Sequence, residues 1–132
     1  MLMKTIRVLI VDDLPQVRQG LANVLRLAAG RIEPVIEIIG EAQNGAEAIQ
    51  QAQTLQPDVV LMDLEMPIMN GYAATRQIKA GQPNIRVIIL SIHAGQNEKT
   101  LARTAGADDF IIKGANYQIL LSAILKIDAR NS

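Results

Sequence analysis

Residues 8–13 read Val-Leu-Ile-Val-Asp-Asp, four branched aliphatic residues followed at once by two acids. A continuous Val/Ile/Leu run is typical of a strand buried on both faces, and such strands belong to parallel sheets covered by helices. Three later runs also end in a polar residue: 59–63 in Asp63, 87–91 in Ser91 and 110–113 in Lys113. Because ligands of such sheets bind outside the carboxyl ends of the strands, we expect these side chains to meet in one crevice.

Helical patterns separate the aliphatic runs. Apolar residues recur there at the three- and four-residue spacing of amphipathic helices. We predict strands at about residues 6–11, 35–39, 59–62, 87–90 and 110–112, and helices at about 15–28, 45–56, 72–79, 97–105 and 117–127. Five alternating βα units predict an α/β fold with a parallel sheet. Since no linker or repeat interrupts the pattern, we expect one domain over residues 1–132.

The composition narrows the classes of protein to consider. Hydrophobic residues make up 49% of the chain and aromatic residues only 2%, so the core must be aliphatic. Thirteen basic residues balance thirteen acidic ones, which gives no overall attraction to nucleic acid or to an anionic membrane. The lack of cysteine excludes disulfides and cysteine-ligated metal sites. With neither a signal-peptide pattern nor a membrane-spanning stretch in the sequence, we expect a cytoplasmic protein.

The strand-end residues share one chemistry. Clustered carboxylates such as Asp12, Asp13 and Asp63 repel each other unless a cation lies between them, and an all-oxygen site suits Mg²⁺. A carboxylate beside Mg²⁺ can attack phosphorus and form an aspartyl-phosphate. Lys113 can supply a positive charge to the new phosphoryl oxygens, and Ser91 can supply a hydrogen bond. These residue types therefore predict phosphoryl transfer to an aspartate.

At these residues the sequence resembles the receiver domains of two-component response regulators. The resemblance extends over residues 6–127, and its motifs lie at residues 8–13, 57–67, 70–71, 89–91, 105–107 and 110–113. It implies a flavodoxin-like, doubly wound fold with a five-stranded parallel sheet in the order 2-1-3-4-5 and five helices. Residues 38–45 and 113–115 are similar to receivers that precede a LuxR-type helix-turn-helix domain. This likeness implies transcriptional control, with DNA contacted only through a domain absent from this chain, and the alternative is a stand-alone receiver.

The resemblance also implies roles for the strand-end residues. Asp63 would accept a phosphoryl group from a histidine kinase. Asp12 and Asp13 would hold Mg²⁺, with help from Asp63 and from the backbone carbonyl of Glu65. Lys113 would contact the phosphoryl group. The protein would then be a phosphoacceptor in phosphorelay signalling rather than an enzyme, although it would assist its own phosphorylation and dephosphorylation.

Two further residues match the switch of the family, and three features depart from its pattern. Ser91 matches the hydroxyl that moves toward the phosphoryl group, and Phe110 matches the aromatic residue that then turns inward. Gly114 stands where most receivers have proline, and Ile92 stands where a small residue is usual. The first connection, residues 30–36, is slightly long. We expect the branched side chain of Ile92 to hinder access to the phosphoryl group.

Several interpretations stay open at this point. The strand that ends in Asp63 is also similar to the nucleophile strand of haloacid-dehalogenase-type phosphatases, although their acidic pair comes last in the chain. A degenerate receiver that serves only as an interaction module is a third candidate. His93 is either an exposed loop residue or a neighbour of the phosphorylation site. Tyr117, Leu121 and Leu125 are either ordinary core or, if exposed, a homodimer surface on the last helix.

Overall fold

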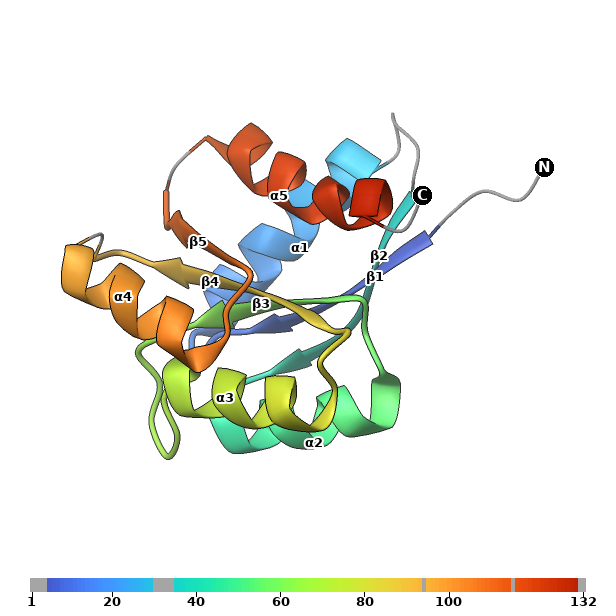
Figure 1. Cartoon of the computed structure of the whole chain (residues 1–132). Coiled ribbons are helices and arrows are strands. Elements are labelled where there is room, and N and C mark those ends of the chain that lie inside the picture. The colour runs from blue at the N-terminus through green and yellow to red at the C-terminus, as the bar shows by residue number, and fades with distance from the viewer. Residues whose placement is uncertain (1–4, 30–34, 94, 115, 131–132) are drawn as a thin grey trace.

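The computed structural model describes residues 5–29, 35–93, 95–114 and 116–130, with residues 28–29 and 127–130 described by their backbone alone. Five parallel strands form one sheet in the order β2-β1-β3-β4-β5, as Figure 1 shows. The strands are β1 (Thr5–Val11), β2 (Val35–Ala42), β3 (Val59–Asp63), β4 (Arg86–Ser91) and β5 (Asp109–Ile112). The predicted α/β fold and strand order are confirmed.

A helix follows each strand. The helices are α1 (Pro15–Ala29), α2 (Gly45–Leu55), α3 (Gly71–Gly81), α4 (Gln96–Ala105) and α5 (Tyr117–Arg130). Asn44 caps α2 by accepting a hydrogen bond from the backbone N–H of Glu47 at 2.8 Å. The long first connection lies mostly outside the described residues, because residues 30–34 are not among them.

The strand β2 is longer than its aliphatic run. It continues past Ile39 to Ala42, and Val11 still pairs with Ala42 at its end. The register shifts between Val8 and Leu9, so that Ile39 is skipped in the pairing. A bulge of this kind follows from long-range pairing rather than from local hydrophobicity, which is why the sequence pattern ended the strand too early.

Helices cover both faces of the sheet (Figure 1). The helices α1 and α5 pack on one face, whereas α2, α3 and α4 cover the other. Successive residues of a strand point to opposite faces, so Val8 and Ile10 join the core under α1 and α5 while Leu9 and Val11 join the other core. The two aliphatic layers hold the strands rigidly and leave the strand ends to carry polar groups.

The last helix supports the core interpretation for two of its three residues in question. Of the three residues considered for a dimer surface, Leu121 is buried in the core and Leu125 packs partly against it, so only Tyr117 is largely exposed. Residues four apart differ by about 40° in their direction around a helix axis. The stripe is therefore exposed at the first turn of the helix and faces the core from the second turn onward. None of the helices in the described ranges combines the length and the hydropathy needed to cross a membrane.

Candidate functional site

Three carboxylates and one ammonium group meet at the carboxyl edge of the sheet. Asp12 and Asp13 directly follow β1, and Asp63 is the last residue of the neighbouring strand β3. One oxygen of each carboxylate lies within 4.8 Å of the others. The Nζ atom of Lys113 lies 2.7 Å from Oδ2 of Asp12 and 3.0 Å from Oδ1 of Asp63. The structure thus brings together four of the five residues that the strand-end pattern singled out, and the fifth, Ser91, ends the strand β4 beside Asp63.

Asp12 is buried and held by hydrogen bonds, whereas Asp13 is partly exposed to solvent. The backbone N–H of Asp12 donates to the carbonyl of Ala42 at 3.0 Å, and its Oδ1 accepts from the backbone N–H of Leu14 at 3.0 Å. Asp12 is almost fully buried, and Asp13 is only half-buried. Asp12 is therefore fixed in position at the site, whereas the carboxylate of Asp13 is partly accessible to solvent.

The site holds more acidic than basic groups. Burial raises the pKa of Asp63, and the neighbouring charges of Asp12 and Asp13 raise it further, while the hydrogen bond from Lys113 acts in the opposite direction. Burial lowers the pKa of Lys113, but its bonds to Asp12 and Asp63 outweigh this effect, so the pKa is raised and the ammonium stays charged. One lysine faces three acids, so the cluster attracts a further cation.

The acidic cluster has the donor set of a hard cation. The described residues contribute only carboxylate oxygens to the cluster, and Mg²⁺ is typically bound by one or two carboxylates together with waters and phosphate oxygens. These residues therefore fit Mg²⁺. Mg²⁺ would be held by Asp12, Asp13 and Asp63 and would neutralise charge at a phosphoryl group.

The loop between β3 and α3 packs closely against the backbone of Asp63. Gly71, the first residue of α3, lies so close to Asp63 that a Cβ atom there would be 2.2 Å from the Asp63 carbonyl oxygen. Its backbone N–H donates to the carbonyl of Leu64 at 3.0 Å. This close approach requires glycine and returns the chain to α3 directly behind Asp63. Glu65 lies in this short loop, two residues after Asp63, and its side chain is exposed.

Ser91 ends β4 beside Asp63 and is buried. Its Oγ accepts a hydrogen bond from the backbone N–H of His93 at 3.0 Å. The His93 side chain is exposed, and its Nε2 lies 3.2 Å from Oε1 of Glu65. Both interpretations of His93 are therefore partly right, because it is an exposed loop residue that also borders the site. Ile92, which lies between Ser91 and His93 in the sequence, is 64% exposed.

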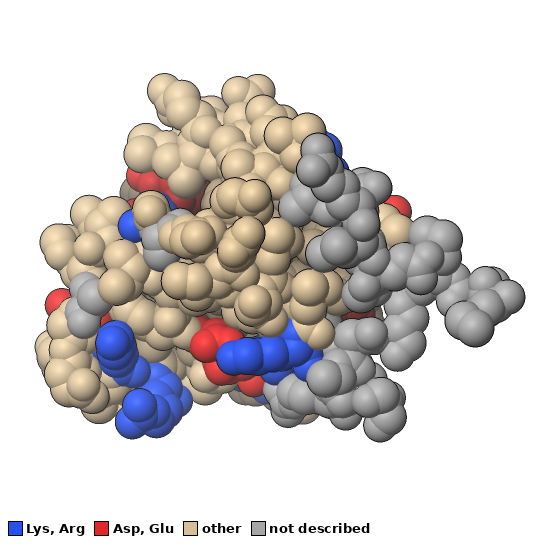
Figure 2. All heavy atoms as spheres, turned by 90° about the horizontal axis from the view of Figure 1, so that it is seen from above, with Lys and Arg blue, Asp and Glu red and all other residues tan. Residues whose placement is uncertain are grey.

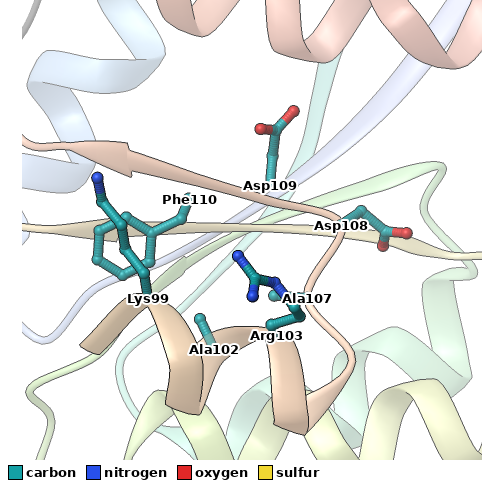
Figure 3. A pocket seen from close by; sticks show the side chains of 7 residues that line it. All are labelled: Lys99, Ala102, Arg103, Ala107, Asp108, Asp109 and Phe110. Carbon is teal, nitrogen blue, oxygen red and sulfur yellow. The ribbon is translucent and has the colours of Figure 1, made fainter. Parts of the chain in front are cut away.

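Phe110 lines a pocket beside α4 and is not part of the cluster of Asp12, Asp13 and Asp63. It is half-buried against the core under α2, α3 and α4. Figure 3 shows it beside a pocket of about 290 Å³ between α4 and β5, and the other lining residues are Lys99, Ala102, Arg103, Ala107, Asp108 and Asp109. The aromatic ring thus has open space next to it, and two basic residues of α4 border that space.

Gly114 has a backbone conformation that proline cannot adopt. Its φ is +84°, in the left-handed region, whereas the ring of proline fixes φ near −65°. The chain therefore leaves Lys113 through a turn that glycine allows at low cost. The absence of proline here therefore belongs to a different local geometry.

Sequence reasoning missed two contacts at this edge. Arg18 of α1 donates to the carbonyl of Asp12 at 2.7 Å, and His93 contacts Glu65. The first joins residues six positions apart, and the second joins two loops that follow different strands. An arginine at a helical position and a histidine in a loop carry no signal of such contacts, so neither could have been found without the fold.

Comparison with known proteins agrees with this geometry. Residues 8–125 match the response regulator receiver domain family. The response regulator protein VraR of Staphylococcus saprophyticus is 38% identical over 92% of this chain, and VraR of Staphylococcus aureus is 39% identical over 92%. The chain spans 56% of the length of each of these relatives.

Solved structures share the fold. A LuxR-family response regulator from an Aurantimonas species superimposes with a TM-score of 0.84 at 34% identity, covering 96% of this chain and 86% of the other. The receiver domain of the response regulator NarL from Mycobacterium tuberculosis has a TM-score of 0.84 at 28% identity, covering 93% and 95%. The chain belongs to the response regulator receiver domain family, whose members act in phosphorelay signalling and are not classical enzymes.

Proposed function

We propose that this chain takes a phosphoryl group onto Asp63 from the phosphohistidine of a histidine kinase, with Mg²⁺ bound at Asp12, Asp13, Asp63 and the backbone carbonyl of Glu65. The observation that carries the proposal is the position of Lys113, which bridges Asp12 and Asp63 at 2.7 Å and 3.0 Å within a cluster of three acids. A lysine in this position compensates negative charge, which is what a phosphoryl acceptor needs.

In the proposed reaction, a carboxylate oxygen of Asp63 attacks phosphorus in line with the leaving imidazole nitrogen. The O–P bond forms as the N–P bond breaks, and the imidazole nitrogen takes up a proton. Catalysis then consists of positioning and charge neutralisation, because the protein forms no other covalent bond. The same groups would assist hydrolysis of the aspartyl-phosphate, with water as the attacking species.

The proposed switch couples the phosphorylation site to the surface between β5 and α4. Ser91 would exchange its bond with the His93 backbone for one with the phosphoryl group, and Phe110 would move into the space that Ser91 leaves. The pocket that Phe110 lines supports this proposal because it leaves one side of the ring unpacked, so fewer contacts are lost when the ring moves. Phosphorylation would thereby shift the population between two packings.

The output we propose is transcriptional control. The similarity to VraR and to LuxR-family regulators supports it, and DNA would be bound by another domain of the protein rather than by this one. The single domain over residues 1–132 would act as the input unit.

Asp63→Asn tests the phosphorylation site. We expect wild-type protein, incubated with acetyl phosphate and Mg²⁺, to gain the mass of one phosphoryl group, and Asp63→Asn to gain none, because an amide oxygen is a poor nucleophile. Intact mass spectrometry gives the result. An equal mass gain in both proteins would place the phosphoryl group elsewhere, and no gain in the folded wild type would favour a degenerate receiver that serves only in interactions.

We also propose that the face formed by α1 and α5 mediates homodimer formation. Figure 2 shows that uncharged residues cover most of this face. An apolar groove of about 440 Å³ lies there, and its lining includes Val17, Leu21, Val24, Ile112, Tyr117 and Leu120. Most of this face is uncharged, although Lys113 also lines the groove, so two copies can pack the same apolar residues together about a two-fold axis.

Tyr117→Glu tests this surface because Tyr117 is half exposed, so the change should leave the core intact. We expect phosphorylated wild type to sediment as a dimer and phosphorylated Tyr117→Glu to sediment as a monomer. Arg103→Glu on the exposed side of α4 is the control, and it should dimerise like wild type. A phosphorylated wild type that stays monomeric in sedimentation velocity would refute the proposal.

A further inference from the structure

Arg18 contacts two separate segments beside the acidic cluster. Its NH1 donates to the main-chain carbonyl of Asp12 at 2.7 Å, and its Nε lies 2.9 Å from Oε1 of Glu41. Arg18 belongs to the first turn of α1, and Glu41 belongs to the end of β2. The side chain of Arg18 is 16% exposed, so the pair is shielded from water on the side of the guanidinium.

The carbonyl that Arg18 binds is part of the peptide unit between Asp12 and Asp13. A peptide unit is planar, so fixing its oxygen also fixes the position of the next nitrogen and Cα atom. The N–H of Asp12 is already bound to Ala42, and its Oδ1 to Leu14. Arg18 therefore completes the anchoring of Asp12 and sets the direction in which the chain carries Asp13 out of the strand.

The two contacts require a guanidinium group. Its donors form a rigid planar fork, so the bond from Nε to Glu41 orients NH1 toward the Asp12 carbonyl. A lysine has one flexible ammonium group and cannot hold both partners in the same way. The Glu41 carbonyl also accepts from Nε2 of Gln51 at 2.9 Å, which ties this end of β2 to α2. The backbone of Glu41 is thus held in place, and its carboxylate, which is 41% exposed, is the second partner of the fork.

We infer that Arg18 is a positioning residue for the Mg²⁺ site, and that the Arg18–Glu41 pair holds the Asp13 carboxylate where it can bind the ion. The inference rests on the proposed function, because it concerns the same site. It assigns a task to a residue that touches neither the ion nor the phosphoryl group. Partners of this kind, which orient a metal ligand, commonly change affinity by about 10- to 100-fold when they are removed.

The experiment measures Mg²⁺ binding by isothermal titration calorimetry and, separately, the rate of phosphorylation by acetyl phosphate as a function of Mg²⁺ concentration. We expect Arg18→Lys to raise both the dissociation constant and the Mg²⁺ concentration for half-maximal rate by about tenfold. The maximal rate at saturating Mg²⁺ should stay that of wild type. Arg26→Lys, on the last turn of the same helix and exposed, is the matched control and should change neither value.

Glu41→Ala removes only the outer anchor and keeps the folded helix, so it tests the inference even if Arg18→Lys cannot be purified. We expect it to raise the same two values by about threefold, as for the loss of a partly exposed ion pair. Unchanged Mg²⁺ affinity in the folded variants would overturn the inference, and so would a lower maximal rate at unchanged affinity. Absence of Mg²⁺ binding in wild type would instead contradict the proposed function.

Discussion

Buried charged groups lie both at the amino edge of the sheet, where the strands begin, and at the carboxyl edge, where they end. The groups at the amino edge are paired within the fold, whereas those at the carboxyl edge leave negative charge in excess. At the amino edge, the Nζ of Lys79 donates to the carbonyls of Pro83 and Ile85, at 3.1 Å and 2.8 Å, and lies 2.9 Å from Oδ2 of Asp108. The same carboxylate oxygen accepts from the backbone N–H of Val87 at 2.8 Å. At the carboxyl edge, one lysine faces three acids.

The difference separates stability from function. A charge whose donors all find partners within the fold contributes to folding and has little capacity left for a ligand. The Asp58 carboxylate at the amino edge accepts from the backbone N–H of Arg7 at 2.8 Å and joins two strands in the same way. The carboxyl edge keeps excess negative charge, at a cost in stability that a bound cation would offset. The comparison predicts that mutations at the two edges affect different properties.

Lys79→Met should have the largest effect on stability. It removes three hydrogen bonds of a half-buried ammonium and leaves Asp108 without this partner, so we expect the free energy of unfolding to fall by about 2 kcal/mol. Urea denaturation gives the value. Lys99→Met on exposed α4 is the control and should change it by less than about 0.5 kcal/mol. Phosphorylation of Asp63 should be unaffected in both, and its loss in folded Lys79→Met would break the separation of the two edges.

Asp13→Asn should have a smaller effect in free energy and should act on the ion instead. We expect the Mg²⁺ affinity to fall by about tenfold or more, about 1.4 kcal/mol, because an amide oxygen replaces a charged ligand. Calorimetric titration measures it. Asp58→Asn at the amino edge is the matched control, with the same chemical change but no change expected in affinity. Equal losses in both variants would mean that overall charge rather than local geometry binds the ion.

Ile92→Ala should have the smallest effect. The exposed side chain of Ile92 follows Ser91 directly, where it would hinder the approach of water to the phosphoryl group. We expect the aspartyl-phosphate to hydrolyse about two- to threefold faster in the variant, which corresponds to less than about 1 kcal/mol. Decay of the phosphorylated mass after removal of the donor measures the rate. Leu27→Ala, exposed on α1, should behave as wild type, and a lifetime in Ile92→Ala that equals or exceeds that of wild type would refute the steric role.

Much of the fold follows from the sequence, and so does the convergence of the candidate site. Each aliphatic run became a strand, and the polar residues that end four of these runs came to the same edge, because all the strands of a parallel sheet end on one side. The roles of Asp63 as phosphoacceptor and of Ser91 and Phe110 as a switch stay predictions. They follow from the family resemblance, and Asp63→Asn tests the first of them.

Other features needed the tertiary structure. The extension of β2 to Ala42 depends on pairing with β1, the burial of Leu121 depends on how α5 lies on the sheet, and the left-handed turn at Gly114 depends on where the chain must go next. The contact of Arg18 with Glu41 joins residues 23 positions apart. Patterns of hydrophobicity determine which face of an element is buried because they repeat locally. The partner of a single polar side chain has no such repeat, and only the packed arrangement of helices and strands decides it.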